Sequence, residues 1–267
     1  MDFSLRRING ENIQYAEAEM DSNIQLIFAP GGFNSGLWEN QLRYFSKKYR
    51  TIAFQPTESY RDFVGERKGL EAVLEQESIQ NAVLVSNPVG NSVISSLSGH
   101  ESVQTTIMTG FGSNNLPPKA VYRGFWAMAK RNPKMLRKSL FSRYTDYRVL
   151  KEFVRELDVP DYSDIESFMN KDMVETDNLS LIINAEEDRF SEIKEARKLN
   201  ARLSMINRAG TFSFYEKPQD YNKALNDFLD IVEEKIRKEE ITKSAEENRS
   251  LIEFGENEKN AVEVRKK

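Results

Sequence analysis

One short segment of the chain has the spacing of a site for acyl transfer. Residues 83–90 predict a strand that runs into a tight turn and then a helix, with the small residues Ser86 and Gly90 at the two ends of the turn. Such a turn presents a nucleophilic serine at its centre when it carries covalent catalysis. The central residue here is Pro88, which has no nucleophilic atom. The segment therefore predicts a catalytic geometry without its attacking group.

A serine nucleophile also needs a base, and His100 is the one histidine in the sequence. Along a helix His100 would lie on the order of 15–18 Å from Pro88, which is beyond the reach of proton transfer. We expect His100 at the surface near a helix end. Ser86 occupies a small-residue packing position and Ser92 lies one helical turn further on. The chain has no cysteine, which excludes thiolate nucleophiles and disulfides, and we expect no metal site and no cofactor.

The elements that position this turn alternate along the chain. Two extended segments surround Asn9-Gly10, which predicts a hairpin. Extended segments are expected at residues 3–8, 13–19, 23–28, 51–54, 82–85, 103–108, 179–184 and 202–206. Helical spacing is found at residues 37–48, 66–77, 89–97 and 192–199 and from Pro218 onward. This alternation predicts an α/β fold, with a mostly parallel sheet flanked by helices.

The alternation stops at residues 112–178, where aromatic residues and methionines recur at helical spacing without a strand signal. We expect an inserted helical lid there. The predicted core then consists of residues 1–111 and 179–235. Residues 236–267 are mostly charged and predict a C-terminal extension, partly helical or disordered, in which Leu251, Ile252 and Phe254 form a small apolar cluster. That extension is either a frayed terminus or a docking segment.

Composition limits the function classes. The chain has 267 residues, 39% of them hydrophobic, which is enough for one sizeable core with a lid. Its net charge of −4 gives no signature of nucleic-acid binding. The N-terminal residues contain no apolar signal-peptide run, and no segment has the length and apolarity of a transmembrane helix. Together with the absence of cysteine, these features lead us to expect a cytoplasmic protein.

Four segments carry a resemblance to a known family. They are Gly31-Gly32 with Ser35-Gly36-Leu37-Trp38, Ser86 and Gly90 at the turn, Asn184-Ala185-Glu186-Glu187-Asp188, and residues 207–218. In this order the chain resembles the lid-bearing α/β-hydrolase superfamily over roughly residues 11–235. The resemblance implies an α/β-hydrolase fold and a catalytic triad of nucleophile, acid and histidine.

At the positions that the resemblance assigns to the triad, the chain keeps one residue of the three. Pro88 stands at the nucleophile position, Asp188 at the acid position and Thr211 at the histidine position. Pro30-Gly31 replaces the His-Gly pair that follows the third strand in the family. Because proline is locked near a φ of −65°, we predict a relaxed turn with Pro88 in the first turn of the following helix. The chain is thus predicted to be a pseudoenzyme, a catalytically degenerate member of the superfamily.

Three functions stay open. The first is binding of a small carbonyl or carboxylate ligand in the former active-site cavity, through the oxyanion-hole N–H groups of Gly32 and Val89. The aromatic residues Phe33, Trp126 and Phe212 would line this site, or would fill it instead. The second is an adaptor for a protein or an anionic membrane surface that uses the charged tail and a basic lid at residues 119–151, in which Asp146 is the one acid. The third is a hydrolase with non-triad chemistry.

The cations of this basic lid are Lys119, Arg123, Lys130, Arg131, Lys134, Arg137, Lys138, Arg143, Arg148 and Lys151.

Overall fold

The computed structural model describes residues 4–7, 14–18, 20–111, 116–169, 171, 178, 180–191, 193–197, 199 and 201–264. The chain divides into two units, Met1–Leu225 and Asn226–Lys267. The first unit contains the sheet, its flanking helices and the helices of the insertion. The described part of the second is the continuation of the last helix.

The described strands form one sheet in the order β1-β2-β4-β3-β5-β6-β7-β8. The strands are β1 (Ser4–Arg7), β2 (Gln14–Ala18), β3 (Gln25–Ala29), β4 (Arg50–Gln55), β5 (Ala82–Ser86), β6 (Val103–Thr109), β7 (Ser180–Ala185) and β8 (Ala201–Ile206). β1 pairs with β2 and β2 with β4 in antiparallel register, whereas every pair from β4 through β3 to β8 is parallel. The predicted α/β fold with a mostly parallel sheet is confirmed. The turn expected at Asn9-Gly10 lies outside the described residues.

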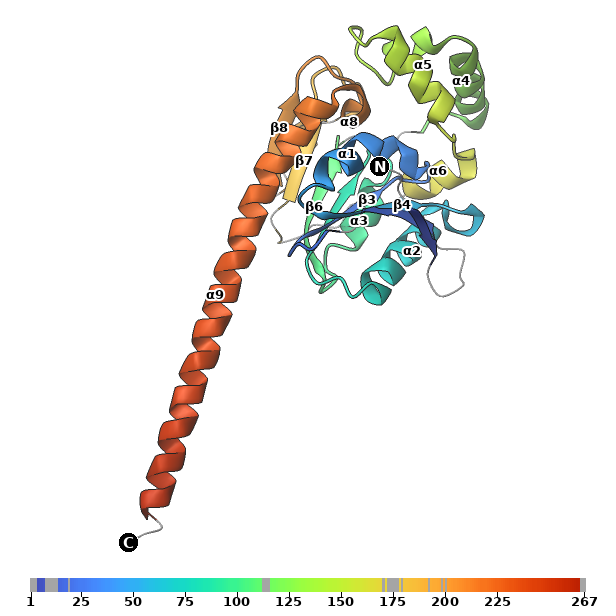
Figure 1. Cartoon of the computed structure of the whole chain (residues 1–267). Helices are drawn as coiled ribbons and strands as arrows, with labels where there is room; N and C mark the ends of the chain where they lie inside the picture. Colours follow the sequence, from blue (N-terminus) through green and yellow to red (C-terminus); the bar gives the residue numbers. More distant parts are fainter. Residues whose placement is uncertain are drawn as a thin grey trace. The chain divides into compact units, whose positions relative to one another are not determined.

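The central strands are apolar along their length because helices cover both faces of a parallel sheet. Leu26, Ile27 and Phe28 of β3 and the apolar run of β5 are fully buried. The flanking helices are η1 (Ser35–Trp38), α1 (Glu39–Phe45), η2 (Glu58–Tyr60), α2 (Phe63–Gln76), α3 (Asn91–Ser96), α7 (Ile193–Ala196), α8 (Ser213–Glu216) and, within the first unit, the beginning of α9 (Pro218–Val264). Figure 1 shows the twisted sheet between these helices.

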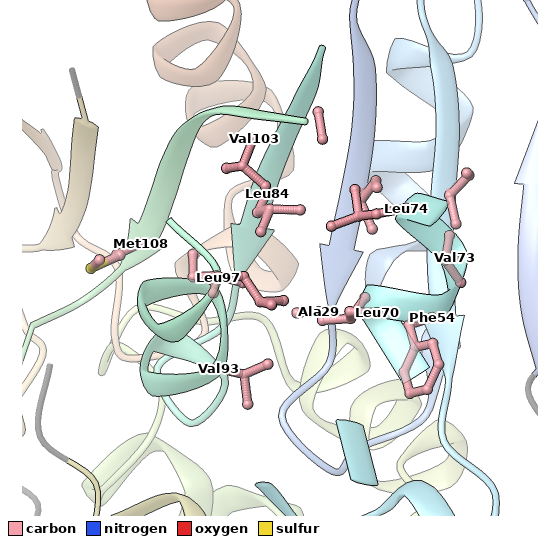
Figure 2. Packing of buried hydrophobic residues seen from close by; sticks show 14 of the residues in the cluster. Ala29, Phe54, Leu70, Val73, Leu74, Leu84, Val93, Leu97, Val103 and Met108 are labelled. Carbon is pink, nitrogen blue, oxygen red and sulfur yellow. The ribbon is translucent and has the colours of Figure 1, made fainter. Parts of the chain in front are cut away.

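The packing of α2 and α3 on the sheet fixes the position of the turn after β5. Figure 2 shows Leu70, Val73 and Leu74 of α2 and Val93 of α3 pointing at the strands. The spacing of Leu70, Val73 and Leu74 places these three side chains on one face of α2. The close packing of α2 on β4 requires Gly69, since a Cβ at this position would lie 2.4 Å from the ring of Phe54.

Between β6 and β7 the described chain is helical. This insertion contains α4 (Lys119–Arg131), η3 (Pro133–Lys138), α5 (Tyr147–Glu156) and α6 (Tyr162–Met169). α4, η3 and α5 pack against one another, and α6 packs against α2 and α3 of the core (Figure 1). The boundaries expected at residues 112 and 178 fall in or beside stretches outside the described residues.

α9 is a single helix of 47 residues that runs through the extension expected at residues 236–267 as far as Val264. In the second unit, Lys238 pairs with Glu234 at 2.6 Å and Lys235 with Glu239 at 3.7 Å, each four residues apart. Such pairs stabilise an exposed helix by about 0.2–0.5 kcal/mol each. Among the described helices, none combines the length and the apolarity that crossing a bilayer requires.

Candidate functional site

The turn after β5 is relaxed, as the proline at its centre predicts. β5 ends at Ser86, and positive φ angles among the described non-glycine residues occur at Ser78 and Arg208, not in this turn. The expectation that Pro88 begins the next helix is wrong, because α3 begins three residues later at Asn91. Pro88 therefore lies in the turn itself, where its fixed φ needs no strain.

Asn87 holds the turn that precedes α3. Its side-chain Oδ1 accepts hydrogen bonds from the backbone N–H groups of Val89 and Gly90, both at 3.0 Å. This is an Asx turn, in which one side-chain oxygen holds two successive backbone N–H groups. The Nδ2 of the buried Asn87 donates to the carbonyl of Pro30, which links the turn to the loop after β3. The N–H of Val89, one of the two expected oxyanion-hole donors, is thus already engaged.

The second expected donor is engaged by a carboxylate. Glu66 in the first turn of α2 accepts the N–H of Gly31 on Oε1 at 2.9 Å and that of Gly32 on Oε2 at 2.7 Å. Both glycines have positive φ, 61° and 79°, and a Cβ at Gly31 would lie 2.5 Å from the nitrogen of Gly90. The loop therefore requires glycine to present two successive N–H groups to one anion.

Glu66 is a buried acid that is bound by neutral donors. Its exposed fraction is 0%, and its carboxylate is held by the backbone of the glycine loop. Burial raises the pKa of Glu66 to about 7, although the hydrogen bonds from Gly32 and Gly31 lower it. Desolvation disfavours the ionised carboxylate, which explains why the pKa is raised. The carboxyl group of Glu66 therefore changes its protonation state near neutral pH.

The three positions of the expected triad come together at the carboxyl edge of the sheet. Thr211 Oγ1 donates to Asp188 Oδ1 at 2.7 Å. A Cβ built on Gly110 would lie 3.1 Å from Asp188 Oδ2 and 3.6 Å from Pro88 Cγ, so both groups border the same point. Asp188 also accepts a hydrogen bond from Ser191 Oγ at 2.6 Å. The carboxylate orients two hydroxyl groups, and neither Thr211 nor Pro88 supplies a base.

Two of the expected ligand-binding aromatics lie in a cluster that joins the core to the insertion. Phe33 and Phe212 have exposed fractions of 3% and 4% and meet edge to face at 6.0 Å between ring centroids. Phe212 also stacks on Phe141 at 6.0 Å and contacts Phe153 at 5.0 Å. These contacts bury both rings in an aromatic cluster, and Phe212 follows Thr211 directly in the chain.

Trp126 belongs to a different cluster. Its ring packs in α4 against Tyr122 at 6.3 Å and Phe125 at 5.2 Å. None of its ring contacts in the described part of the chain reaches Pro88, Asp188 or Thr211. The five residues expected to bind a ligand are thus divided among a glycine loop, a turn, an aromatic cluster and the insertion.

The remaining candidate side chains are used locally. Ser86 Oγ donates to Asn91 Oδ1 at 2.6 Å, and Ser92 Oγ donates to the carbonyl of Phe168 at 3.2 Å. His100 Nδ1 accepts the N–H of Ser102 at 3.2 Å. In the described ranges, no group of three or more histidine, aspartate or glutamate side chains could hold a metal ion. None of these residues adds a base to the site.

Sequence reasoning missed Glu66 and Asn87, although each left a signal. Glu66 precedes Leu70 and Val73 by four and seven residues, so it lies on the buried face of α2. A carboxylate on an apolar stripe needs a buried partner. Asn87 directly precedes a proline, a pair that favours turn initiation. Neither signal identifies the backbone group that is bound.

Three solved structures are similar to this chain. A bromoperoxidase from Bacillus anthracis is 14% identical with a TM-score of 0.65, and the match covers 86% of this chain and 100% of that chain. A thermophilic esterase from Thermogutta terrifontis is 14% identical with a TM-score of 0.68, and the match covers 86% of this chain and 97% of that chain. A putative aryl esterase from Burkholderia cenocepacia is 20% identical with a TM-score of 0.66, and the match covers 82% of this chain and 94% of that chain. No protein-family model matches the chain, and no curated protein matches its sequence. The sheet order and these similarities show that the chain has the α/β-hydrolase fold.

Proposed function

We propose that this chain does not hydrolyse esters and acts by binding a partner at its surface. Ester hydrolysis on this fold needs a nucleophile, a base and two N–H donors for the oxyanion. Pro88 and Thr211 stand at the first two positions, and side chains of Glu66 and Asn87 hold the donors of Gly32 and Val89. The observation that carries the proposal is that the nucleophile and the base are absent while side chains hold both N–H donors.

Surface binding is favoured over binding in the former cavity by the aromatic contacts. Phe33 and Phe212 are buried against each other, and Phe212 also contacts rings of the insertion. A ligand beside Thr211 would have to displace these rings as well as the two side chains that occupy the donors. Exposed groups of the insertion, in contrast, are accessible without rearrangement.

Hydrolysis of a short-chain nitrophenyl ester by the purified chain tests the proposal. We expect the rate of a protein without an active site, unchanged in Asp188→Asn and Ser86→Ala. The variant Pro88→Ser with Thr211→His should also stay inactive, because Glu66 still holds the N–H of Gly32. Wild-type turnover that decreases in Asp188→Asn would contradict the proposal and identify a hydrolase with an unrecognised nucleophile.

A small carboxylate ligand is the second candidate, and one observation favours it. The glycine loop already binds a carboxylate, that of Glu66, through two N–H groups. A soluble carboxylate could take its place when Glu66 is protonated or removed. Titration of Glu66→Ala with butyrate, followed by the amide resonances of labelled glycine, should shift Gly31 and Gly32 if the candidate is correct. Unchanged resonances at millimolar butyrate would exclude it.

A further inference from the structure

The insertion concentrates positive charge in an acidic protein. Residues 130–151 contain eight lysines and arginines and one acid, Asp146, in a chain whose net charge is −4. These residues cover the end of α4, all of η3, the following loop and the start of α5. Because α4, η3 and α5 pack against one another, the cations lie on one compact group of helices (Figure 1).

Some of these cations have structural partners and others do not. Arg137 donates to the carbonyl of Thr145, and Arg143 approaches Glu187 at 3.3 Å. Lys130, Arg131 and Lys138 are exposed, and no ion pair recorded among the described residues uses their side chains. We define the basic surface as Lys130, Arg131, Lys134, Lys138, Arg148 and Lys151.

Exposed apolar and aromatic side chains are interleaved with this charge. Met128 is 51% exposed and Tyr144 57% exposed. The guanidinium groups of Arg143 and Arg208 lie 4.9 and 5.4 Å from the ring centre of Tyr144, so cations flank an accessible ring. Tyrosine rings next to lysine and arginine are typical of the boundary between lipid headgroups and acyl chains.

We propose that the basic surface docks the protein on a bilayer that contains anionic phospholipids. The inference rests on the proposed non-catalytic function and names its partner. Clustered cations are attracted by the negative potential of such a bilayer, while Met128 and Tyr144 enter the headgroup region. If the partner is instead an acidic protein, the chain will bind neither kind of vesicle in the experiment below.

The charge of the insertion reverses after residue 151, and this reversal orients the contact. Residues 152–166 contain six acids and one basic residue, Arg155. Asp158 pairs with Arg61 of the core, while Asp161 and Asp164 lie beside each other at the start of α6. An anionic bilayer repels this segment, so the protein contacts it with residues 130–151 and keeps α6 directed away.

Co-sedimentation with vesicles tests the proposal on the full chain. Vesicles of phosphatidylcholine alone are compared with vesicles that contain one quarter phosphatidylserine. We expect binding to the second kind only, and weaker binding as salt is raised. The variant Lys130→Gln, Arg131→Gln, Lys138→Gln should lower the partition coefficient about a hundredfold. A control that removes three exposed cations of the core, Lys47→Gln, Lys68→Gln, Arg202→Gln, should keep most of the wild-type binding.

Three results would overturn the proposal. They are equal binding to both kinds of vesicle, no binding to either, and equal losses in the two triple variants. Thermal melts followed by circular dichroism should be the same for both triple variants and the wild type, which excludes a folding defect as the cause of lost binding. The ester assay is an independent measurement. Ester turnover together with vesicle binding would refute the proposed function alone. A chain that neither hydrolyses the ester nor binds vesicles would refute the docking surface alone.

Discussion

Polar groups in the turn after β5 are bound inside the protein, whereas those of the basic surface of the insertion are exposed to solvent. At the turn, the N–H groups of Gly31, Gly32 and Val89 are each bound by a buried side chain. On the basic surface, Lys130, Arg131 and Lys138 extend into solvent. The first region therefore contributes to stability, and the second is available to a partner.

This contrast separates two kinds of variant. Substitutions around the turn leave buried donors or acceptors unpaired, which is costly in a medium of low dielectric constant. Substitutions on the basic surface change the charge presented to solvent and leave the packing intact. The expected effects below run from the largest to the smallest.

Glu66→Ala tests the turn region most directly. It leaves the N–H groups of Gly31 and Gly32 buried without an acceptor, and we expect the free energy of unfolding to fall by about 3 kcal/mol. Urea unfolding at pH 5 measures this loss. Glu75→Ala, an exposed acid on the same helix, is the matched control and should change stability by less than about 0.5 kcal/mol. Equal effects of the two variants would show that the glycine loop does not depend on Glu66.

The pH dependence of stability follows from the same carboxyl group. Burial raises the pKa of Glu66 from 4.5 to about 7, so between these pH values the folded state binds more protons than the unfolded state. Stability from this group is full below pH 4.5 and decreases as pH rises through 7, by about 3 kcal/mol in all. Urea unfolding from pH 5 to 8 should show this decrease in the wild type relative to Glu66→Gln. Parallel curves for the two proteins would contradict the assignment.

Gly210→Ala tests the attachment of the insertion to the core. A Cβ there would lie 2.6 Å from both the carbonyl oxygen of Leu140 and Cα of Phe141, which are backbone atoms and cannot rotate away. We expect a loss of about 2 kcal/mol from this overpacking and faster limited proteolysis near residue 140. Gly124→Ala in α4 is the control, since nothing lies within 4 Å of its added Cβ.

Thr211→Val should have a smaller effect. Asp188 loses the hydroxyl donor at 2.7 Å but keeps Ser191 Oγ and the N–H of Phe190. We expect a loss of about 1 kcal/mol in thermal or urea unfolding. Thr242→Val, at an exposed position of α9, provides the comparison. A loss above about 3 kcal/mol would mean that Asp188 depends on Thr211 far more than its other two donors allow.

The triple variant of the basic surface should change stability least. Lys130→Gln, Arg131→Gln and Lys138→Gln remove exposed charges, and we expect the free energy of unfolding to stay within about 0.5 kcal/mol of the wild type. The same urea titration checks this. A large loss would place these cations among the structural contacts and remove the contrast between the two regions.

The sheet could be predicted from the sequence because its central strands are continuous apolar runs. β3 and β5 are buried on both faces, and the helices between them repeat apolar residues at three and four positions. The start of α3 could not be predicted in this way. The Asn87 side chain holds the N–H groups of Val89 and Gly90 in a turn, and no apolar period marks where that turn ends and the helix begins.

The candidate site was predictable in its positions and not in its contacts. Pro88, Asp188 and Thr211 meet because the carboxyl ends of parallel strands share one edge. The engagement of the Gly32 donor depends on Glu66, 34 residues away along the chain. Local patterns do not specify which backbone group a distant helix will approach, so that contact required the folded arrangement.

The order of Asn87 and Pro88 also bears on how this turn ages chemically. Asparagine loses its amide when the backbone nitrogen of the next residue attacks the side-chain carbonyl and closes a succinimide ring. A prolyl nitrogen carries no proton and cannot form that ring as an amide nitrogen does. Conversion to aspartate would place an oxygen where Nδ2 donates to the carbonyl of Pro30. Pro88 therefore protects, over the lifetime of the protein, the amide that holds the turn and the glycine loop together.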